Sequence, residues 1–507
     1  MDDENELIAL RRQKLEALRA RGVDPFGRSF ATSGSLGELR EKFSEGETLR
    51  AAGRITAHRD MGKSHFLDLR DATGRMQIYV QAKELGAEAM ETFALLDIGD
   101  FIGVEGSCFF TKTGEPTLKV HRLEVLAKTL RPLPEKWHGL TDVEARYRQR
   151  YLDLATNDRS REVFTKRIAI LREMREFLQA RGFLEVETPM LQTVPGGAAA
   201  EPFCTHHNAL GVDLYLRIAP ELYLKRLLVG GFNKVFELNR NFRNEGISRR
   251  HNPEFTMLEA YWAYADFEKI AELVEEMICH LATKLEGRAS SRPSLIGNAE
   301  TPETRTGERP SLQVEHRDAA GNVIRTLNLT RPWRRARYRD LVMEAAGADW
   351  FGLTTEGRRG KCPELGVEIS PRMADYEVTQ QVFEKLVEEK TFDPLFVTHC
   401  PKELVPLAKQ NPDDDSIVDV FELIINGQEI APGYSELNDP VVQRQRLLEQ
   451  AGEETQKLDE DFLLALEHGM PPAGGFGLGI DRLTMLLTGA ESIRDVILFP
   501  LLKPKRD

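Results

Sequence analysis

Apolar and polar residues alternate in short runs over the first quarter of the chain, and turn-forming residues separate the runs. Alternation with a period of two is typical of half-buried strands, and the Asp71–Gly74 and Thr113-Gly114 segments supply hairpin turns. One helix is predicted at residues 83–95. Five strands are predicted, at residues 48–57, 65–69, 76–80, 101–110 and 117–126. Five strands with a helix between the third and fourth are what a small closed β-barrel of the OB-fold type requires.

The pattern changes beyond Tyr147. Residues 162–181 are predicted to form a long amphipathic helix that ends at Gly182, and mixed strands and helices follow to the C-terminus. The Pro-rich segment 131–134 interrupts regular structure and is typical of a linker. The predicted boundaries are therefore 1–46 for a helical N-terminal extension, 47–135 for the barrel and 136–507 for the second domain.

One part of the second domain differs from its surroundings in composition. Residues 287–310 are rich in Ser, Pro, Thr, Glu and Arg and poor in apolar residues, which is typical of an exposed and disordered insertion. Residues 314–329 are predicted to form an additional hairpin that turns around residues 319–322. We therefore expect 287–330 to be a partly exposed insertion.

Bulk composition excludes several classes of protein. The chain has 507 residues, of which 41% are hydrophobic, enough for ordinary cores in several domains. No apolar run approaches the ~20 residues that cross a bilayer, so no membrane association is expected. The acidic start Met-Asp-Asp-Glu has the wrong charge for a secretory peptide. Five cysteines without paired spacing indicate reduced thiols and a cytoplasmic protein.

The net charge of −13 gives little indication of a nucleic-acid partner, but contact with a nucleic acid depends on local patches. Six basic residues gather near the N-terminus: Arg11, Arg12, Lys14, Arg19, Arg21 and Arg28. They are interpreted equally well as a patch that binds nucleic acid or as the solvated face of a helix. In the second interpretation Leu7, Leu15 and Leu18 point inward.

The strongest chemical signal is a basic loop between two predicted strands, at residues 234–240 and 256–262. The loop holds Arg243, Arg249, Arg250 and His251 around the carboxylate of Glu245, and an aromatic residue, Phe255, follows at its return. Guanidinium groups match phosphate oxygens with paired donors, and an aromatic ring can stack on a base. A solvated hairpin tip would not account for the histidine and the aromatic, so the loop predicts a nucleotide site.

This loop resembles motif two of class II aminoacyl-tRNA synthetases, in the wording of the lysyl-tRNA synthetases. Residues 182–191 resemble motif one and residues 477–482 resemble motif three. Segments 195–198, 205–208 and 217–226 also resemble lysyl enzymes, and the resemblance extends from about residue 48 to 504. It implies a class II catalytic domain with an antiparallel sheet flanked by helices, and an overall α+β fold. It also implies ATP-dependent activation of L-lysine and its transfer to tRNA(Lys) by a homodimer.

The resemblance assigns roles around ATP. Arg243, His251 and Arg482 are the expected catalytic residues: Arg243 on the α-phosphate and substrate carboxylate, and His251 with Arg250 on the γ-phosphate. Phe255 and Arg482 are expected on opposite faces of adenine. Glu245 is expected to accept a hydrogen bond from the adenine amine or the tRNA end. Gly477 and Gly479 would let the backbone approach the nucleotide, or would mark a strand-to-helix turn that needs a positive φ.

A predicted hairpin that turns at Asn426-Gly427 carries Glu422 and Glu429. The resemblance makes these two carboxylates the ligands of Mg²⁺ on the ATP phosphates, because magnesium prefers hard oxygen ligands. The alternative is a pair of exposed hairpin acids.

A pocket for free lysine should be acidic, because the substrate carries two ammonium groups. By resemblance, Glu221, Glu259 and the backbone near Gly197 receive the α-ammonium, and Glu436 and Tyr261 receive the ε-ammonium. One position departs from the pattern, because Pro432 stands where lysyl enzymes commonly have an Asn that donates to the substrate carboxylate. Proline has neither a side-chain donor nor a backbone N–H.

In the predicted barrel, Arg59, Phe66 and Gln77 have the spacing of the anticodon-binding residues of the related synthetases. The resemblance places Phe66 under the central anticodon base and Gln77 at its edge. From the residues alone, Phe66 would be a core residue and Gln77 a surface residue. Cys204, His206 and His207 are interpreted as structural polar residues and not as metal ligands, because adjacent strand residues point to opposite faces.

Two other functions fit parts of the pattern. A paralogous ligase that attaches lysine to a translation factor resembles the catalytic part but lacks the anticodon barrel. A catalytically inactive tRNA-binding paralogue would not be expected to keep the phosphate-binding, metal-binding and motif-three residues together.

Overall fold

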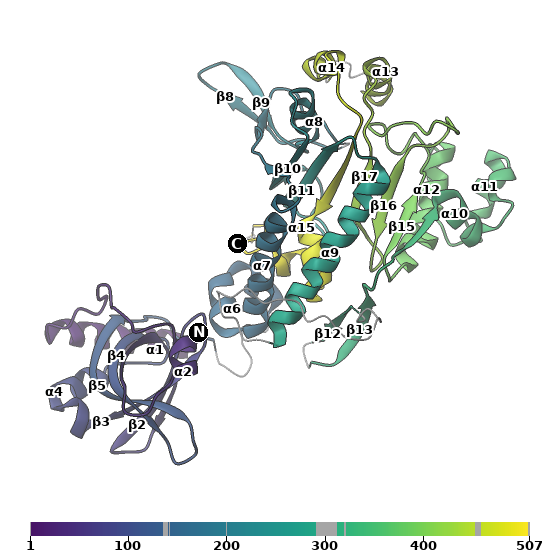
Figure 1. Cartoon of the computed structure of the whole chain (residues 1–507). Helices are drawn as coiled ribbons and strands as arrows, with labels where there is room; N and C mark the ends of the chain where they lie inside the picture. Colours follow the sequence, from purple (N-terminus) through teal and green to yellow (C-terminus); the bar gives the residue numbers. More distant parts are fainter. Residues whose placement is uncertain are drawn as a thin grey trace. The chain divides into compact units, whose positions relative to one another are not determined.

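The computed structural model describes residues 2–134, 140, 142–198, 200–290, 312–318, 321–451 and 458–504 (Figure 1). The chain divides into two compact units, Met1–Val143 with Tyr151–Thr156, and Glu144–Arg150 with Asn157–Asp507. Residues 291–311, which hold most of the insertion predicted from composition, lie outside the described residues.

The first unit is built around a closed five-stranded barrel, which confirms the OB-fold prediction. Its strands follow the order β1-β2-β3-β5-β4, and only the β3–β5 pairing is parallel. Side chains such as Ile55, Leu69 and Ile78 fill the interior. The strands are β1 (Thr48–Asp60), β2 (Ser64–Arg70), β3 (Arg75–Gln81), β4 (Phe101–Phe110) and β5 (Pro116–Ala127).

The single helix predicted at 83–95 is wrong in detail. Two short helices, α3 (Ala82–Leu85) and α4 (Ala87–Phe93), occupy this stretch instead. Gly86 separates them because its φ of 88° lies in the left-handed region, which no residue of a right-handed helix adopts.

The N-terminal helices α1 (Asp2–Ala20) and α2 (Leu36–Glu41) belong to the same unit. Leu15 and Leu18 are buried as predicted, but Leu7 is exposed, so its predicted inward orientation is wrong. Two of the basic residues serve the fold. Arg11 is buried and donates to Thr129 Oγ1 at 2.7 Å, and Lys14 pairs with Asp97 at 2.5 Å. At these two positions, neither a solvated face nor a free basic patch describes the helix.

The second unit is organised by an eight-stranded sheet of order β14-β15-β16-β17-β18-β11-β10-β6. The strands from β15 to β10 pair antiparallel, which confirms the prediction, while the two edge strands β14 and β6 pair parallel. The strands are β6 (Leu184–Glu185), β10 (Lys234–Phe242), β11 (Glu254–Ala263), β14 (Arg334–Arg337), β15 (Leu395–Thr398), β16 (Val420–Ile424), β17 (Glu429–Ser435) and β18 (Ala473–Gly479).

Helices cover this sheet because its apolar side chains must be removed from water. The main core joins the central strands to α7 (Asp158–Gln179), α9 (Phe267–Ser290) and α15 (Ile480–Thr488), and Figure 1 shows α9 lying along the sheet. The helix predicted at 162–181 is α7, which begins earlier because Asn157 caps it. A second core lies under α10 (Tyr338–Ala346) and α12 (Asp375–Leu386).

The remaining elements are short. The predicted hairpin is present as the antiparallel pair β12 (Gln313–Arg317) and β13 (Val323–Asn328), whose turn includes residues 319–320 outside the described part. The other elements are α5 (Val143–Arg148), α6 (Arg150–Thr156), β7 (Leu191–Gln192), β8 (Cys204–His207), β9 (Val212–Leu216), α8 (Glu221–Val229), η1 (Trp350–Gly352), α11 (Thr355–Lys361), η2 (Glu388–Lys390), α13 (Pro440–Ala451), α14 (Glu460–Glu467) and α16 (Ile493–Val496).

A buried ion pair fixes the segment that leads into α8. Arg217 Nη1 lies 2.6 Å from Glu237 Oε1 on β10, and its Nε donates to the carbonyl of Arg240 at 2.9 Å. Thr188 Oγ1 donates to the other Glu237 oxygen at 2.7 Å. Because Arg217 is fully buried, each of its donors needs a protein acceptor.

We expect Arg217→Met to lower the free energy of unfolding by about 3–5 kcal/mol, because the substitution leaves the Glu237 carboxylate buried without its cation. Urea unfolding would measure the change. The matched control is Arg240→Met on β10, which removes an exposed pair with Glu254 at 3.5 Å and should cost less than ~1 kcal/mol. Equal losses in the two variants would contradict this prediction.

Candidate functional site

The loop between β10 and β11 closes one side of a cavity of about 210 Å³. The eight residues predicted to bind the nucleotide all line it, although they come from two separate parts of the chain. They are Arg243, Glu245, Arg250, His251, Phe255, Gly477, Gly479 and Arg482. The antiparallel pairings of β10 with β11, and of β11 with β18, bring these parts together.

Cations dominate the polar lining of this cavity. The Arg243 guanidinium lies over the Phe255 ring at 5.1 Å, and its Nε is buried without a hydrogen-bond partner in the part of the chain that the structure describes. Arg482 Nη2 is 3.2 Å from His251 Nε2. Burial lowers the pKa of His251, and Arg482 lowers it further, so the imidazole is neutral at pH 7. The cavity is therefore suited to anionic oxygen atoms.

The two glycines of the third motif do not adopt a positive φ, so that interpretation is wrong. Gly479 has a φ of −72° and forms the N-cap of α15. A Cβ atom at Gly477 would lie 2.9 Å from Met257 Cε, so a side chain there would require the end of the Met257 side chain to shift. This arrangement leaves the β18 backbone accessible to the cavity.

Asp481 joins both sides of the cavity and was not predicted. Its Oδ2 accepts from the backbone N–H of Thr256 on β11 at 2.9 Å, and its Oδ1 pairs with Arg167 of α7 at 2.6 Å. Its position beside Arg482, within the motif at residues 477–482, is the sequence signal that could have identified it. Asp481 ties the start of α15 to the strand that follows the basic loop.

The predicted hairpin of β16 and β17 is confirmed, with Asn426 and Gly427 both at positive φ, as a tight hairpin turn requires. Its two carboxylates are partly buried, so the interpretation as exposed hairpin acids is wrong. Burial, and then the nearby Glu429, raise the pKa of Glu422 to about 8, and burial also raises the pKa of Glu429. Neither carboxylate forms an ion pair with a described residue. A pair of hard carboxylate oxygen donors whose pKa values are raised by burial is suited to a divalent metal ion.

The four side chains predicted to bind lysine, Glu221, Glu259, Tyr261 and Glu436, are all buried and lie together. Tyr261 Oη donates to Glu259 Oε2 at 3.1 Å. Burial, with Glu221 as the second cause, raises the pKa of Glu259 to about 8. Glu436 Oε1 has no hydrogen-bond partner among the described residues. The cluster is a buried acidic pocket, as predicted.

Sequence reasoning missed a cation in this pocket. The Lys225 Nζ lies 2.7 Å from Glu221 Oε1 and 2.6 Å from Glu436 Oε2. The spacing of Glu221 and Lys225, four residues apart on α8, is the signal that could have indicated the first contact. The contact with Glu436 depends on tertiary structure.

Two glycines give the acidic pocket its shape. Gly197 has a φ of 88°, and a Cβ there would lie 3.3 Å from Glu221 Cβ, so the 195–198 segment passes directly over Glu221. A Cβ at Gly475 would lie 2.2 Å from Glu436 Oε1 and 2.6 Å from the Tyr261 ring. Any side chain at Gly475 would therefore displace the carboxylate at the end of the pocket.

Pro432 and Tyr434 lie on β17 between the two sites. Pro432 lines the nucleotide cavity, and the β17–β18 ladder begins at the next residue, Gly433, where a backbone N–H is again available. Tyr434 was not predicted as a site residue. Its hydroxyl donates to Glu221 Oε1 at 2.8 Å, the same oxygen that Lys225 contacts.

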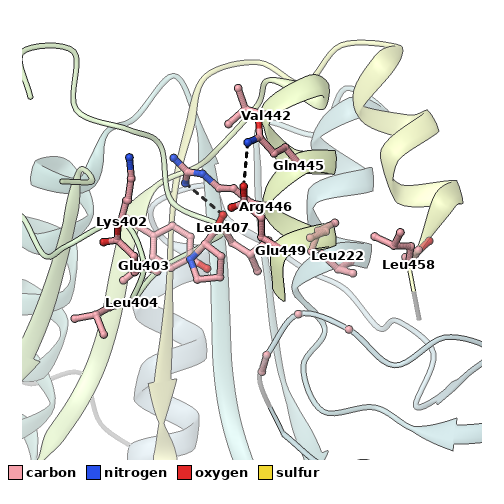
Figure 2. A pocket seen from close by; sticks show the side chains of 18 of the residues that line it. Leu222, Lys402, Glu403, Leu404, Leu407, Val442, Gln445, Arg446, Glu449 and Leu458 are labelled. Atoms are coloured by element: carbon pink, nitrogen blue, oxygen red, sulfur yellow. Dashed lines mark hydrogen bonds between the residues drawn. The ribbon is translucent and has the colours of Figure 1, made fainter. Parts of the chain in front are cut away.

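A larger cavity of about 1150 Å³ begins at the acidic pocket, because Gly197 and Tyr434 also line it. Figure 2 shows Lys402 and Leu404 at one side of it and Leu222 and Leu458 at the other. Arg446 of α13 holds the 402–410 loop by donating to the carbonyl of Ala408 at 2.6 Å. The cavity provides an open approach to the acidic pocket.

In the barrel, Arg59, Phe66 and Gln77 lie on the neighbouring strands β1, β2 and β3. Phe66 is partly exposed and contacts Tyr79 with ring centroids 5.0 Å apart, so the interpretation as a core residue is wrong. Gln77 is buried, not a surface residue, and its Oε1 accepts from Thr117 Oγ1 at 2.9 Å. This bond orients the amide of Gln77 next to the Phe66 strand.

The Cys204–His207 strand shows local contacts. His206 Nδ1 lies 2.7 Å from Asp213 on the paired strand, and His207 Nδ1 accepts from the Leu210 N–H at 3.2 Å. All five cysteines are free. No helix in the described part of the chain is long and apolar enough to cross a membrane.

Family models match nearly the whole chain. Residues 142–503 match the model of tRNA synthetases class II (D, K and N), and residues 49–126 match the OB-fold nucleic acid binding domain. The chain therefore belongs to the class II tRNA synthetases.

Its relatives identify the group within this family. The lysine–tRNA ligase of Carboxydothermus hydrogenoformans is 48% identical over 510 residues, which cover 99% of both chains. The lysine–tRNA ligase of Pelotomaculum thermopropionicum is 48% identical over 515 residues, 99% of this chain and 96% of that protein. The lysine–tRNA ligase of Moorella thermoacetica is 46% identical over the full length of both. The resemblance stated from the motifs is confirmed.

The carboxylate pair makes stability in metal-free buffer depend on pH. Because the pKa of Glu422 is about 8 in the folded protein and ~4.3 in an unfolded chain, the unfolded state loses this proton first as pH rises. The free energy of unfolding should therefore fall between about pH 5 and 8, by up to ~1.4 kcal/mol per pH unit. We expect Glu422→Gln to reduce this slope, as measured by urea unfolding in EDTA.

The matched control is Glu272→Gln, which changes an exposed carboxylate on α9 and should leave the slope unchanged. A wild-type slope that Glu422→Gln does not alter would contradict the protonated state of this carboxylate.

Proposed function

We propose that this chain uses ATP to activate L-lysine as lysyl-adenylate and then transfers the lysyl group to the 3′ end of tRNA(Lys). One observation carries the proposal: a cavity lined by arginines adjoins a buried pocket lined by carboxylates. The two are close enough for the Glu259 carboxylate of the pocket to interact electrostatically with Arg243 of the cavity. ATP brings anionic oxygens and free lysine brings two ammonium groups, so each substrate matches one compartment.

In the activation step, a carboxylate oxygen of lysine attacks the α-phosphorus of ATP, and the bond from that phosphorus to the pyrophosphate oxygen breaks. Arg243, whose buried Nε has no partner among the described residues, holds the α-phosphate and the attacking carboxylate. Arg250 and neutral His251 contact the γ-phosphate, Glu245 contacts the adenine amine, and Arg482 stacks on adenine opposite Phe255. No covalent enzyme intermediate is needed.

Glu422 and Glu429 would hold Mg²⁺, which neutralises charge on the ATP phosphates when bound. The raised pKa of Glu422 supports this role, because a carboxylate that is protonated alone becomes a good ligand once a cation arrives.

Lysine is selected by charge at both ends of the acidic pocket. Glu221, Glu259 and the backbone at Gly197 receive the α-ammonium, while Glu436 and Tyr261 receive the ε-ammonium. The unpartnered Oε1 of Glu436 supports this assignment, because a buried carboxylate oxygen requires a donor. Pro432 removes one donor from the substrate carboxylate, which leaves that contact to Arg243. The larger cavity that shares Gly197 and Tyr434 provides the path for lysine.

In the transfer step, a ribose hydroxyl of the tRNA end attacks the lysyl carbonyl and AMP leaves. The barrel would select the tRNA, with Phe66 stacking on the central anticodon base, Gln77 bonding its edge and Arg59 near the backbone. This barrel disfavours a ligase that modifies a translation factor, and the intact nucleotide cavity disfavours an inactive paralogue. The proposed site of the reaction in the cell is the cytoplasm, where tRNA, ATP and lysine are all present.

The active form would be a homodimer. Its interface would involve α7 and the residues after it, as motif one implies. Exposed apolar side chains on this stretch, Ile168, Leu184 and Leu191, support the assignment, because isolated chains seldom leave such groups together in water.

We expect Arg243→Ala to lower lysine-dependent ATP–pyrophosphate exchange at least ~100-fold while the protein stays folded, because the α-phosphate loses its main charged donor. The matched control is Arg240→Ala on the adjoining strand, whose exposed side chain lies outside the cavity lining. Exchange rates for Arg243→Ala close to those of the control would remove Arg243 from the reaction. Testing each of the twenty amino acids in this assay would verify the choice of lysine.

We expect Phe66→Ala to leave pyrophosphate exchange nearly unchanged and to weaken tRNA charging by ~1–3 kcal/mol in kcat/KM, because one base loses its stacking partner. Phe26→Ala, an exposed aromatic of the same unit, is the control and should charge normally. If tRNA with an altered central anticodon base is charged as well as native tRNA, the barrel does not select by the anticodon.

A further inference from the structure

Lys225 is a fully buried cation that the reaction scheme does not use. It lies on α8, and its Nζ contacts Glu221 Oε1 at 2.7 Å and Glu436 Oε2 at 2.6 Å. These are the carboxylates at opposite ends of the proposed lysine pocket. One ammonium of the protein thus bridges the groups that would receive the two ammonium groups of the substrate.

Electrostatics explains why a bridge is needed. Two carboxylates held close together in a water-poor interior repel each other, and a cation placed between them reduces this repulsion. Burial alone would lower the pKa of Lys225, but Glu221 and Glu436 reverse the effect and raise it, so the bridge stays charged. The neighbouring Tyr434 hydroxyl donates to Glu221 at 2.8 Å, and it carries no charge that could replace the ammonium.

The bridge occupies only part of the acceptor capacity. Lys225 contacts Oε2 of Glu436, while Oε1 of the same carboxylate has no hydrogen-bond partner in the described part of the chain. That oxygen packs directly against Gly475, because a Cβ there would lie only 2.2 Å away from it. The unpaired Oε1 of Glu436 and the glycine at position 475 therefore lie next to each other at the end of the pocket.

We propose that Lys225 is a positioning residue for lysine recognition: its ammonium holds the carboxylates of Glu221 and Glu436 at a fixed separation, with their remaining oxygens turned to the substrate. The inference rests on the proposed lysine pocket and adds to it a determinant of substrate length. Because the Lys225 ammonium contacts both Glu221 and Glu436, it fixes the distance between these two carboxylates. The two ammonium groups of the substrate must match that distance. Lysine is favoured over the shorter ornithine for this reason.

A purely structural ion pair would behave differently. Its loss would lower stability and reduce the amount of active enzyme, with little change in the KM for lysine relative to the KM for ATP. Loss of a positioning residue raises the KM for lysine selectively. It also reduces discrimination between lysine and ornithine, because the carboxylates are no longer held at one separation.

The test uses the full-length enzyme in lysine-dependent pyrophosphate exchange. In Lys225→Met, which keeps the chain length and removes the charge, we expect the KM for lysine to rise at least ~30-fold and the KM for ATP to stay within ~2-fold. The preference for lysine over ornithine should fall at least ~10-fold. The matched control is Arg226→Met, which removes the neighbouring ion pair of α8 with Asp459 at 2.6 Å and should spare both ratios.

A second variant keeps the test decisive if Lys225→Met folds poorly. Lys225→Ala leaves space for the missing propylammonium group, so added n-propylamine should restore at least part of the lysine affinity, whereas 1-propanol of similar size should not. Glu436→Gln tests the pocket itself: if it leaves the KM for lysine unchanged, the lysine pocket is wrongly assigned.

If Glu436→Gln raises that KM but Lys225→Met changes both KM values in parallel, as a stability defect would, Lys225 is structural and the inference fails. It also fails if n-propylamine and 1-propanol act equally on Lys225→Ala, or if neither variant folds and propylamine rescues nothing.

Discussion

The catalytic unit depends on one constraint: a carboxylate that is removed from water needs a cation or a proton donor within contact distance. The buried acids on and beside the central sheet meet it differently. Glu237 pairs with Arg217, Asp481 with Arg167, and Glu436 with Lys225. Glu422 lacks such a partner among the described residues and holds a proton instead, with a pKa of about 8. The acids whose charges are incompletely neutralised by the protein are the ones proposed to bind Mg²⁺ or the substrate. Incomplete neutralisation of a buried carboxylate therefore identifies the residues of the site.

The antiparallel sheet brings together residues that are far apart in the sequence. Registers such as Glu259↔Gly477 and Tyr261↔Gly475 place the basic loop, the acidic pocket and the glycine-rich strand β18 on adjacent strands. Close packing then controls access. At Gly475 and Gly477 the absence of a side chain leaves room for Glu436 and Met257. The glycines of β18 therefore determine the shape of the pocket. The rigid sheet supplies the precision that positioning and charge neutralisation require.

Local signals in the sequence account for much of the fold and of the nucleotide site. Alternating patterns predicted the five barrel strands, and the Asn426-Gly427 turn predicted the β16–β17 hairpin, because both signals act through backbone preferences. The basic loop with its aromatic return predicted the nucleotide cavity, and the family resemblance supplied roles that spacing alone left open. Two errors arose where burial decides, since Leu7 is exposed and Gln77 is buried. A third arose from backbone conformation, since the positive φ of Gly86 divides a predicted helix.

By itself, the sequence determined the strand and helix order, the class of chemistry and the candidate residues, since residue type and periodicity carry that information. Only the tertiary structure decided which charged side chains form ion pairs with one another. Lys225 and Glu436 are far apart in the sequence, and no local rule predicts a contact of 2.6 Å between them. The same holds for Asp481, whose partners belong to α7 and β11. Long-range ion pairs depend on how strands and helices pack around a shared interior, and that arrangement is a property of the whole folded chain.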